Sequence, residues 1–282
     1  MSACPLQCGS ARAPVLALRA RGYDIFRCPD CGAGRVRAEG FRPEQYYDEA
    51  YFNGGRDGAY TDYVGSEGVL RHEFREQLDF LTGFVPGGKL LEIGCAYGFF
   101  LREARRRFEV FGVEVAPAAV AHCHASGLTN VRQGELDAEW LALHGPFDAI
   151  AMLDVIEHID DVGGTMELAL RHLRPGGVLL VTTGDWSSRF ARVMGASWRL
   201  IAPPLHLWYL TPDSLRRLFA RFGLRQVHLS RPWKRVPVSL ILDQAAAMLR
   251  LPRPRPAGWL SRLGLPANLF DAMRMVFRKD VD

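Results

Sequence analysis

Short runs of apolar residues, separated by amphipathic stretches, occur along most of the chain. A short apolar run bounded by glycine, proline or polar residues is typical of a buried strand. Such runs predict seven strands, at residues 90–93, 110–113, 129–131, 147–153, 178–183, 224–229 and 271–277. Strands that alternate with longer amphipathic segments are typical of an α/β protein, in which helices cover a sheet.

Two of the amphipathic stretches carry clear helix signals. A helix is predicted over residues 67–84 from four apolar residues at helical spacing, Leu70, Phe74, Leu78 and Leu81. Near the C-terminal end, Thr211 and Pro212 are typical of the first residues of a helix, and Gly223 is typical of its end. Residues 239–249 form a third, more apolar candidate helix.

A turn with two glycines follows the strand at 90–93. Gly94 and Gly98 let the backbone bend tightly and let a ligand approach where a Cβ would block it. The helix that begins near Phe100 offers free N–H groups at its N-terminus. Glu114 closes the next strand about 20 residues downstream, where nucleotide-binding folds place a carboxylate for ribose hydroxyls. This order predicts a nucleotide-type binding crevice.

Several motifs together resemble the class I S-adenosylmethionine (SAM)-dependent methyltransferases. They are Glu92-Ile93-Gly94 with Gly98, Glu114 at a strand end, Asp154 with Glu157-His158, and Pro175-Gly176-Gly177 before a strand. The closest likeness is to bacterial small-molecule enzymes with a cysteine-rich leader, and it covers nearly the whole chain. The resemblance implies a Rossmann-like seven-stranded, mostly parallel sheet whose last strand is antiparallel, plus a small N-terminal zinc-ribbon-like module.

The resemblance also implies a division of the chain. Residues 1–40 would form the ribbon, residues 41–88 an aromatic-rich helical lead-in that covers the cofactor site, and residues 89–282 the methyltransferase domain. Within that domain, residues 184–210 would be a substrate lid and residues 232–268 an insertion. The insertion could cover the substrate mouth, form a dimer contact or touch a membrane.

The same family likeness assigns residues to the cofactor. Glu92 would orient the turn or meet the amino group of SAM through water, and Glu114 would take both ribose hydroxyls. Glu135 would recognise the adenine amino group, although Asp137 could fill that role, and Leu136 would press on the adenine face. The full set of expected cofactor contacts is Glu92, Gly94, Cys95, Gly98, Phe99, Glu114, Val115, Glu135, Leu136 and Asp154.

Candidate catalytic residues lie at the ends of later strands. Asp154 would lie beside the transferable methyl, with Glu157 and His158 close by, and such a cluster can orient substrate or accept a proton. Helix capping is an equally ordinary role for Asp154. His206 is the first candidate for a general base because histidine exchanges a proton near neutral pH. A buried structural histidine is the alternative.

Four cysteines near the N-terminus have the spacing of a metal site. Cys4 and Cys8 form one pair, and Cys28 and Cys31 form another, with a predicted hairpin between them. Four thiolates fit tetrahedral zinc with no open position, so the metal would be structural. The first pair is spaced by three residues rather than two, which weakens the match, and four free thiols are the alternative.

Composition limits the remaining choices. The 282 residues are 48% hydrophobic and 23% charged, and the net charge is +4, which does not by itself indicate a nucleic-acid partner. The N-terminus lacks the basic start and apolar run of a secretory signal, and no apolar stretch approaches the roughly 18 residues of a membrane span. A cytoplasmic monomer or homodimer is therefore expected.

An aromatic-rich stretch precedes the first strand of the main sheet, with Phe41, Tyr46, Tyr47, Tyr51, Phe52, Tyr60 and Tyr63. It would either close over the cofactor pocket or pack between the ribbon and the main domain.

The leading hypothesis is transfer of a methyl group from SAM to a small molecule such as a sugar nucleotide, a glycan precursor or a specialised metabolite, with oxygen as the accepting atom. One alternative is an RNA methyltransferase that uses the ribbon to bind its substrate, although the ribbon's arginines lack an obvious aromatic stacking platform. The other is a catalytically inactive SAM-binding or scaffold protein.

Overall fold

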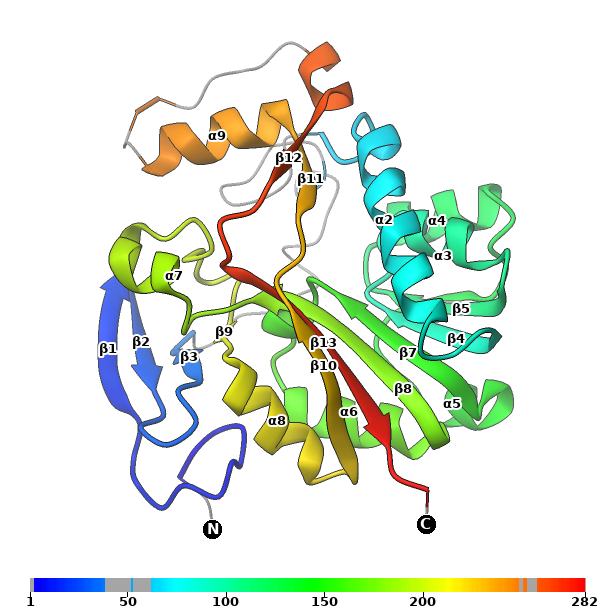
Figure 1. Ribbon diagram of the computed structural model, residues 1–282, viewed down its shortest axis with the longest axis horizontal. Coiled ribbons are helices and arrows are strands. Elements are labelled where there is room, and N and C mark those ends of the chain that lie inside the picture. The colour runs from blue at the N-terminus through cyan, green and yellow to red at the C-terminus, as the bar shows by residue number, and fades with distance from the viewer. Residues whose placement is uncertain (1–2, 39–51, 53–61, 249–250, 253–257, 282) are drawn as a thin grey trace.

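A computed structural model describes residues 3–38, 52, 62–248, 251–252 and 258–281 (Figure 1). Its main sheet has seven strands in the order β10-β13-β8-β7-β4-β5-β6. The strands are β4 (Gly88–Ile93), β5 (Phe108–Glu114), β6 (Val131–Gln133), β7 (Phe147–Leu153), β8 (Leu173–Gly184), β10 (Leu224–Ser230) and β13 (Ala272–Lys279). Only β13 runs antiparallel to its neighbours, and it lies between β8 and β10. The predicted fold class, a mostly parallel seven-stranded sheet with an antiparallel last strand, is confirmed.

Helices cover both faces of this sheet. On one face lie α5 (Ala138–His144), α6 (Val162–Arg171) and α8 (Pro212–Ala220), and on the other lie α2 (Glu67–Thr82), α3 (Phe99–Ala104) and α4 (Pro117–Ala125). Neighbouring residues of one strand belong to opposite layers, since Leu91 lies in the core that includes α6 and α8 while Leu90 lies in the core that includes α2 and α3. Burial on both sides explains why the strands are continuous apolar runs rather than alternating ones.

The N-terminal residues form a second, smaller sheet. Strand β1 (Val15–Ala20) pairs with β2 (Tyr23–Arg27) in the predicted hairpin, and β3 (Gly34–Val36) pairs with β2. The fourth strand is β9 (Trp208–Tyr209), which comes from the segment after β8 and pairs with β3. The cysteine-bearing module and the expected lid therefore share one sheet, a connection that the sequence did not predict.

The rest of the segment after β8 is folded and anchored. It contains α7 (Arg189–Met194) and the short η3 helix (Gly195–Ser197). The carboxylate of Asp271, at the start of β13, is buried and accepts hydrogen bonds from Trp198 Nε1 at 2.7 Å and from Arg199 Nη2 at 3.0 Å. An ion pair with this little exposure is costly to open. Residues 198–199 are therefore held against the start of β13.

The insertion leaves the main sheet at the end of β10 and returns at the start of β13. Strand β11 (Lys234–Pro237) pairs antiparallel with β12 (Gly264–Ala267). Between them lie α9 (Val238–Met248), which confirms the third predicted helix, and the η4 helix (Gly258–Arg262). Figure 1 shows these elements together at the top of the view, beyond the end of the sheet next to α2. A Cβ on Gly264 would lie 2.7 Å from Val69 of α2, so the base of the insertion packs tightly there.

Two aromatic residues of the lead-in pack on the glycine turn. Phe52 and Tyr63 are buried, and the ring of Tyr63 stacks on Phe99 with centroids 5.3 Å apart. Phe52 meets Tyr97 edge-to-face at 5.0 Å. These contacts place both residues against the turn that follows β4. The other lead-in aromatics, Phe41, Tyr46, Tyr47, Tyr51 and Tyr60, lie outside the described residues.

Candidate functional site

The turn after β4 has an unusual backbone. Gly94, Ala96 and Gly98 all adopt positive φ, at 71°, 46° and 72°. A Cβ on Gly94 would lie 2.7 Å from the side chain of Val155, and one on Gly98 would lie 2.5 Å from Leu128. Both glycines are therefore required by conformation and by packing. Ala96 adopts the same left-handed region at a cost of roughly 1 kcal/mol.

Glu114 connects this turn to the end of β5. Its carboxylate is 6% exposed, and its two oxygens accept hydrogen bonds from the backbone N–H of Ala96 at 2.7 Å and of Ala116 at 2.9 Å. Burial raises the pKa of Glu114, and these N–H donors act in the opposite direction. A carboxylate offers about four acceptor positions, so each oxygen can still accept a hydroxyl.

Glu92 lies near the end of β4, just before the turn, and carries an unsatisfied group. The side chain is 3% exposed, and Oε2 has no hydrogen-bond partner in the described part of the chain. Burial raises the pKa of Glu92 well above its usual range, with smaller effects from Cys123 and Glu114. Because buried polar atoms are nearly always hydrogen-bonded, this oxygen indicates a ligand group that donates a hydrogen bond or carries positive charge.

The side chains of two other expected cofactor residues, Cys95 and Phe99, are buried. The thiol of Cys95 is buried beside Cys123; that neighbouring thiol and burial raise its pKa, so it is not an activated nucleophile. Phe99 is buried under Tyr63.

The adenine side of the expected site lies after β6. Glu135 is exposed, and Leu136 is half-buried against the core. Asp137 caps α5, since its carboxylate accepts the backbone N–H of Trp140 at 2.8 Å, and it pairs with Arg132 at 3.0 Å. The Asp137 carboxylate is thus already engaged in capping, whereas Glu135 extends towards solvent. Val115 is half-buried directly after Glu114.

Asp154 follows β7 and lies in a cluster that the sequence did not predict. Its φ is +55°, and one carboxylate oxygen accepts the hydroxyl of Thr182 at 3.0 Å. The other accepts Lys234 Nζ at 2.6 Å, and Lys234 also lies 3.9 Å from Glu73 of α2. Three segments that are distant in sequence, α2, the end of β7 and β11 of the insertion, therefore meet here.

The charges of this cluster are interdependent. Burial acts to raise the pKa of Asp154, but Lys234 outweighs it, so that pKa is lowered. Burial acts to lower the pKa of Lys234, but Asp154 and Glu73 outweigh it and raise that pKa to about 12. Burial raises the pKa of Glu73 to about 7. No pattern in the sequence singles out Lys234, although it is one of only three lysines in the chain.

Two histidines from different segments meet beside this cluster. The rings of His158 and His206 are 4.7 Å apart. His158 Nδ1 donates to the carbonyl of Leu205 at 2.9 Å, and His206 Nδ1 donates to that of Leu200 at 2.8 Å. A carbonyl only accepts, so both rings carry the Nδ1 proton when neutral, and Nε2 of each is the acceptor. The structure thus places side by side two histidines that the sequence offered only as separate candidates.

Burial keeps this pair neutral. It lowers the pKa of His158 to about 4 and that of His206 to about 3. The adjacent Glu157 accepts the Thr183 hydroxyl at 2.9 Å, and burial raises its pKa to about 8. One ligand-type atom from each of Glu157, His158 and His206 lies within 4.8 Å of the others. These groups can orient a hydroxyl and share its proton, although an imidazole with so low a pKa stores that proton poorly.

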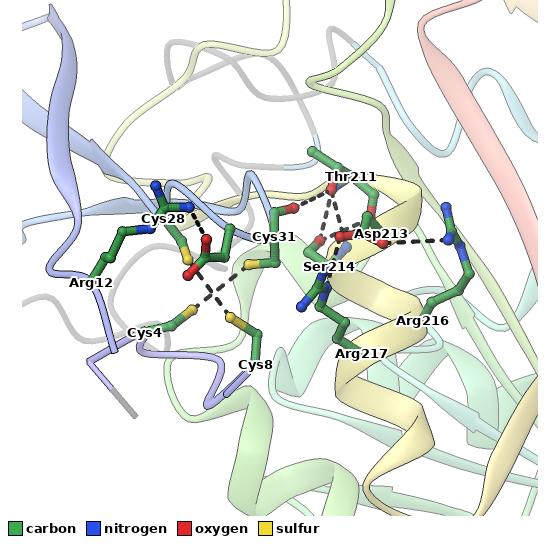
Figure 2. A network of polar contacts seen from close by, with 11 residues as sticks. Cys4, Cys8, Arg12, Cys28, Cys31, Thr211, Asp213, Ser214, Arg216 and Arg217 are labelled. Atoms are coloured by element: carbon green, nitrogen blue, oxygen red, sulfur yellow. Dashed lines mark hydrogen bonds and ion pairs between the residues drawn. The ribbon is translucent and has the colours of Figure 1, made fainter. Parts of the chain in front are cut away.

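The four N-terminal cysteines converge on a single point, as Figure 2 shows. Cys4 Sγ lies 3.8 Å from Cys31 Sγ, and Cys8 Sγ lies 3.7 Å from Cys28 Sγ. Zinc–sulfur bonds of about 2.3 Å in a tetrahedron require sulfur–sulfur distances of about 3.8 Å. The donor set and its spacing therefore fit a tetrahedral zinc ion. The Thr211 hydroxyl donates to the carbonyl of Cys31 at 2.8 Å and ties this cluster to the start of α8.

Comparison with known proteins agrees with this geometry. The sequence matches the family described as "Methyltransferase domain" over residues 67–229, which is more than half of the chain. A protein of Cereibacter sphaeroides named "Ubiquinone biosynthesis O-methyltransferase" is 34% identical over 178 residues, covering 59% of this chain and 70% of that protein. A protein of the same name from Dinoroseobacter shibae is 30% identical over 184 residues, covering 58% and 74%.

Solved structures share the fold. A SAM-dependent methyltransferase from Archaeoglobus fulgidus has a TM-score of 0.52 at 16% identity, and the match covers 77% of this chain and 99% of that protein. The YcgJ protein from Bacillus subtilis has a TM-score of 0.51 at 14% identity and covers 75% of this chain. The family match includes the glycine turn, and the sheet has the strand order described above. The chain therefore belongs to the class I SAM-dependent methyltransferases.

Proposed function

We propose that this enzyme transfers the methyl group of SAM to a hydroxyl oxygen of a small molecule. The observation that carries the proposal is that two groups of residues lie at the carboxyl ends of the parallel strands. Glu92 and Glu114, beside the glycine turn, would form a crevice for the cofactor, and Asp154, His158 and His206 form a polar cluster for an acceptor. The relatives named as O-methyltransferases support oxygen as the accepting atom.

In this proposal the crevice residues hold SAM by its polar groups. Glu92 Oε2, which has no partner among the described residues, would meet the positively charged amino group. The two oxygens of Glu114 would accept the ribose hydroxyls, and Glu135 would meet the adenine amino group beside Leu136. Gly94 and Gly98 would border the methionine portion. SAM supplies a methyl group that its sulfonium has already activated, so the protein must position a nucleophile and manage one proton.

The acceptor hydroxyl would lie between Asp154 and the histidine pair. His206 Nε2, left as an acceptor by the bond from Nδ1 to Leu200, would take a hydrogen bond from that hydroxyl. Asp154, held by Lys234, would keep the acceptor in line with the methyl group. Since His206 holds a proton weakly, the proton released would pass on to nearby carboxylates or to solvent.

For the N-terminal module, over residues 1–40, we propose a structural zinc held by Cys4, Cys8, Cys28 and Cys31. Its sulfur spacing supports this assignment, and a ribbon of this size has too little core to fold without such a ligand. The ribbon reaches the acceptor cluster through β9, because the N–H of Leu207 donates to the carbonyl of Glu157 at 2.9 Å.

The ribose assignment can be tested by calorimetry. Glu114→Gln should weaken SAM binding by more than about tenfold, because the amide loses the charge and presents a donor to the N–H of Ala96 or Ala116. Glu109→Gln, on the exposed side of the same strand, is the matched control and should bind normally. Near-normal affinity of the Glu114 variant would refute the assignment, and absence of heat from the wild type with SAM would refute the whole proposal.

His206 should matter for transfer and not for cofactor binding. With the best hydroxylated acceptor from a panel of phenols and sugar nucleotides, His206→Ala should slow release of S-adenosylhomocysteine by about a hundredfold. Its SAM affinity should stay within error of wild type. His172→Ala, at the opposite end of β7, is the control. Unchanged turnover would remove His206 from the reaction.

Lys234 tests whether the insertion completes the acceptor site. Lys234→Met removes the charge that holds Asp154 and should lower turnover about tenfold or more while SAM affinity is kept. Lys89→Met is the matched control, because Lys89 Nζ donates to the carbonyl of His144 at the other end of the sheet. Equal turnover in both variants would show that the Lys234–Asp154 contact has no part in transfer.

Metal analysis tests the ribbon. Protein purified without chelator should hold one zinc per chain, and Cys28→Ser with Cys31→Ser should lose it and unfold at a lower temperature, since metal binding free energy is folding free energy. Cys123→Ser, a buried thiol remote from the cluster, should keep the zinc. A metal-free wild type that is equally stable with and without chelator would overturn the assignment.

A further inference from the structure

Exposed apolar side chains concentrate in residues 231–248, 251–252 and 258–270, which we call the cap. Fourteen large apolar side chains are exposed across the described residues, and eight of them belong to the cap. They are Trp233, Leu242, Leu251, Trp259, Leu263, Leu265, Leu269 and Phe270. Proteins that stay monomeric in water rarely expose so many bulky residues together, and such surfaces mark sites of interaction.

The aromatic members of this set are the most informative. Trp233 is 62% exposed, Trp259 is 61% exposed and Phe270 is 59% exposed. Indole has an apolar body and one polar N–H, and it prefers the boundary between lipid headgroups and hydrocarbon. Two tryptophans this accessible therefore indicate that the cap contacts a lipid surface rather than water alone.

The charge of the cap has one sign. Its described residues include a single acidic residue, Asp243, and four basic residues, which are Arg231, Lys234, Arg235 and Arg262. Arg231 and Lys234 are committed to Asp185 and Asp154 inside the fold, whereas Arg235 and Arg262 are exposed. Basic residues beside exposed apolar ones complement an anionic lipid surface.

The same charge argues against a second copy as the partner. In a two-fold dimer the same surface patch faces itself, so two caps in contact would bring like charges together. The exposed leucines, Leu251, Leu263, Leu265 and Leu269, also suit hydrocarbon better than the stacked bases of a nucleic acid. Of the described helices, none has the length and hydropathy needed to cross a bilayer, so the contact would be peripheral.

The position of the cap fits this contact. Its base is anchored on α2 through Gly264 and Val69, while α9 and η4 stand clear of the main sheet in Figure 1. Trp233 directly precedes Lys234, whose ammonium contacts Asp154. A surface that contacts the cap therefore lies close to the proposed acceptor site.

We propose that the cap docks on an anionic phospholipid membrane. Trp233, Trp259 and Phe270 enter the headgroup region, and Arg235 and Arg262 pair with anionic headgroups. The proposal goes beyond methyl transfer and does not depend on which acceptor is used. It places the mouth of the acceptor site at the bilayer surface, where an acceptor with a lipid portion can be reached.

Vesicle flotation with the full chain tests the proposal. Binding is compared between vesicles of phosphatidylcholine alone and vesicles in which about one quarter of the lipid is phosphatidylglycerol. The wild type should float with the anionic vesicles and bind the neutral ones at least about tenfold more weakly, and added salt should reduce binding.

Two cap variants and one control separate the contributions. Trp233→Ser with Trp259→Ser should weaken binding about tenfold or more through lost apolar contact, and Arg235→Glu with Arg262→Glu should do the same through charge. Leu143→Ser with Val193→Ser removes two side chains that are 76% and 84% exposed outside the cap and should change nothing. Normal heats of SAM binding in all three variants show that each is folded.

Three results would overturn the proposal. The first is absence of vesicle binding by the wild type at low salt, and the second is vesicle binding that the cap variants leave unchanged. The third is a wild type that binds no vesicles but dimerises or binds RNA, with that property lost in the tryptophan variant.

Discussion

The buried carboxylate of Glu114 is the contact on which the glycine turn after β4 depends. It holds the N–H groups of Ala96 and Ala116, one from the glycine turn and one from the segment after β5. Hydrogen bonds to an ionised group contribute roughly 1.5–3 kcal/mol each, enough to offset the left-handed conformation of Ala96. The turn is therefore held in place before any ligand arrives.

The parallel sheet brings the remaining groups to the same edge. Asp154 follows β7 and Thr182 lies at the end of β8, and the two are joined by a hydrogen bond. The proposed acceptor cluster is completed by residues outside the sheet, since Lys234 comes from the insertion and His206 from the segment after β8. Such sheets place ligands beyond the carboxyl ends of their strands, and here the flanking segments supply the polar groups that a bare sheet lacks.

The cysteine module supports this edge rather than standing apart from it. Strand β3 pairs with β9, Leu207 donates to the carbonyl of Glu157, and Arg35 pairs with Asp160 just beyond His158. A metal that orders the N-terminal residues would thus influence the histidine pair through backbone hydrogen bonds, without touching the acceptor. The insertion supports the opposite side through Lys234 and Glu73, so the acceptor region is bounded by two appended elements.

The sequence alone determined the elements whose signals are local. Apolar runs located the strands of the main sheet, glycine spacing located the turn, and cysteine spacing located the four thiols, because each depends on residues close together along the chain. Glu114 could be found because strand length fixes its distance from the turn. Tertiary structure alone revealed the Lys234–Asp154–Glu73 cluster, the strand β9 shared with the ribbon and the low pKa values of His158 and His206. Those features arise from burial and from contacts between residues far apart in sequence, and neither leaves a periodic pattern in the chain.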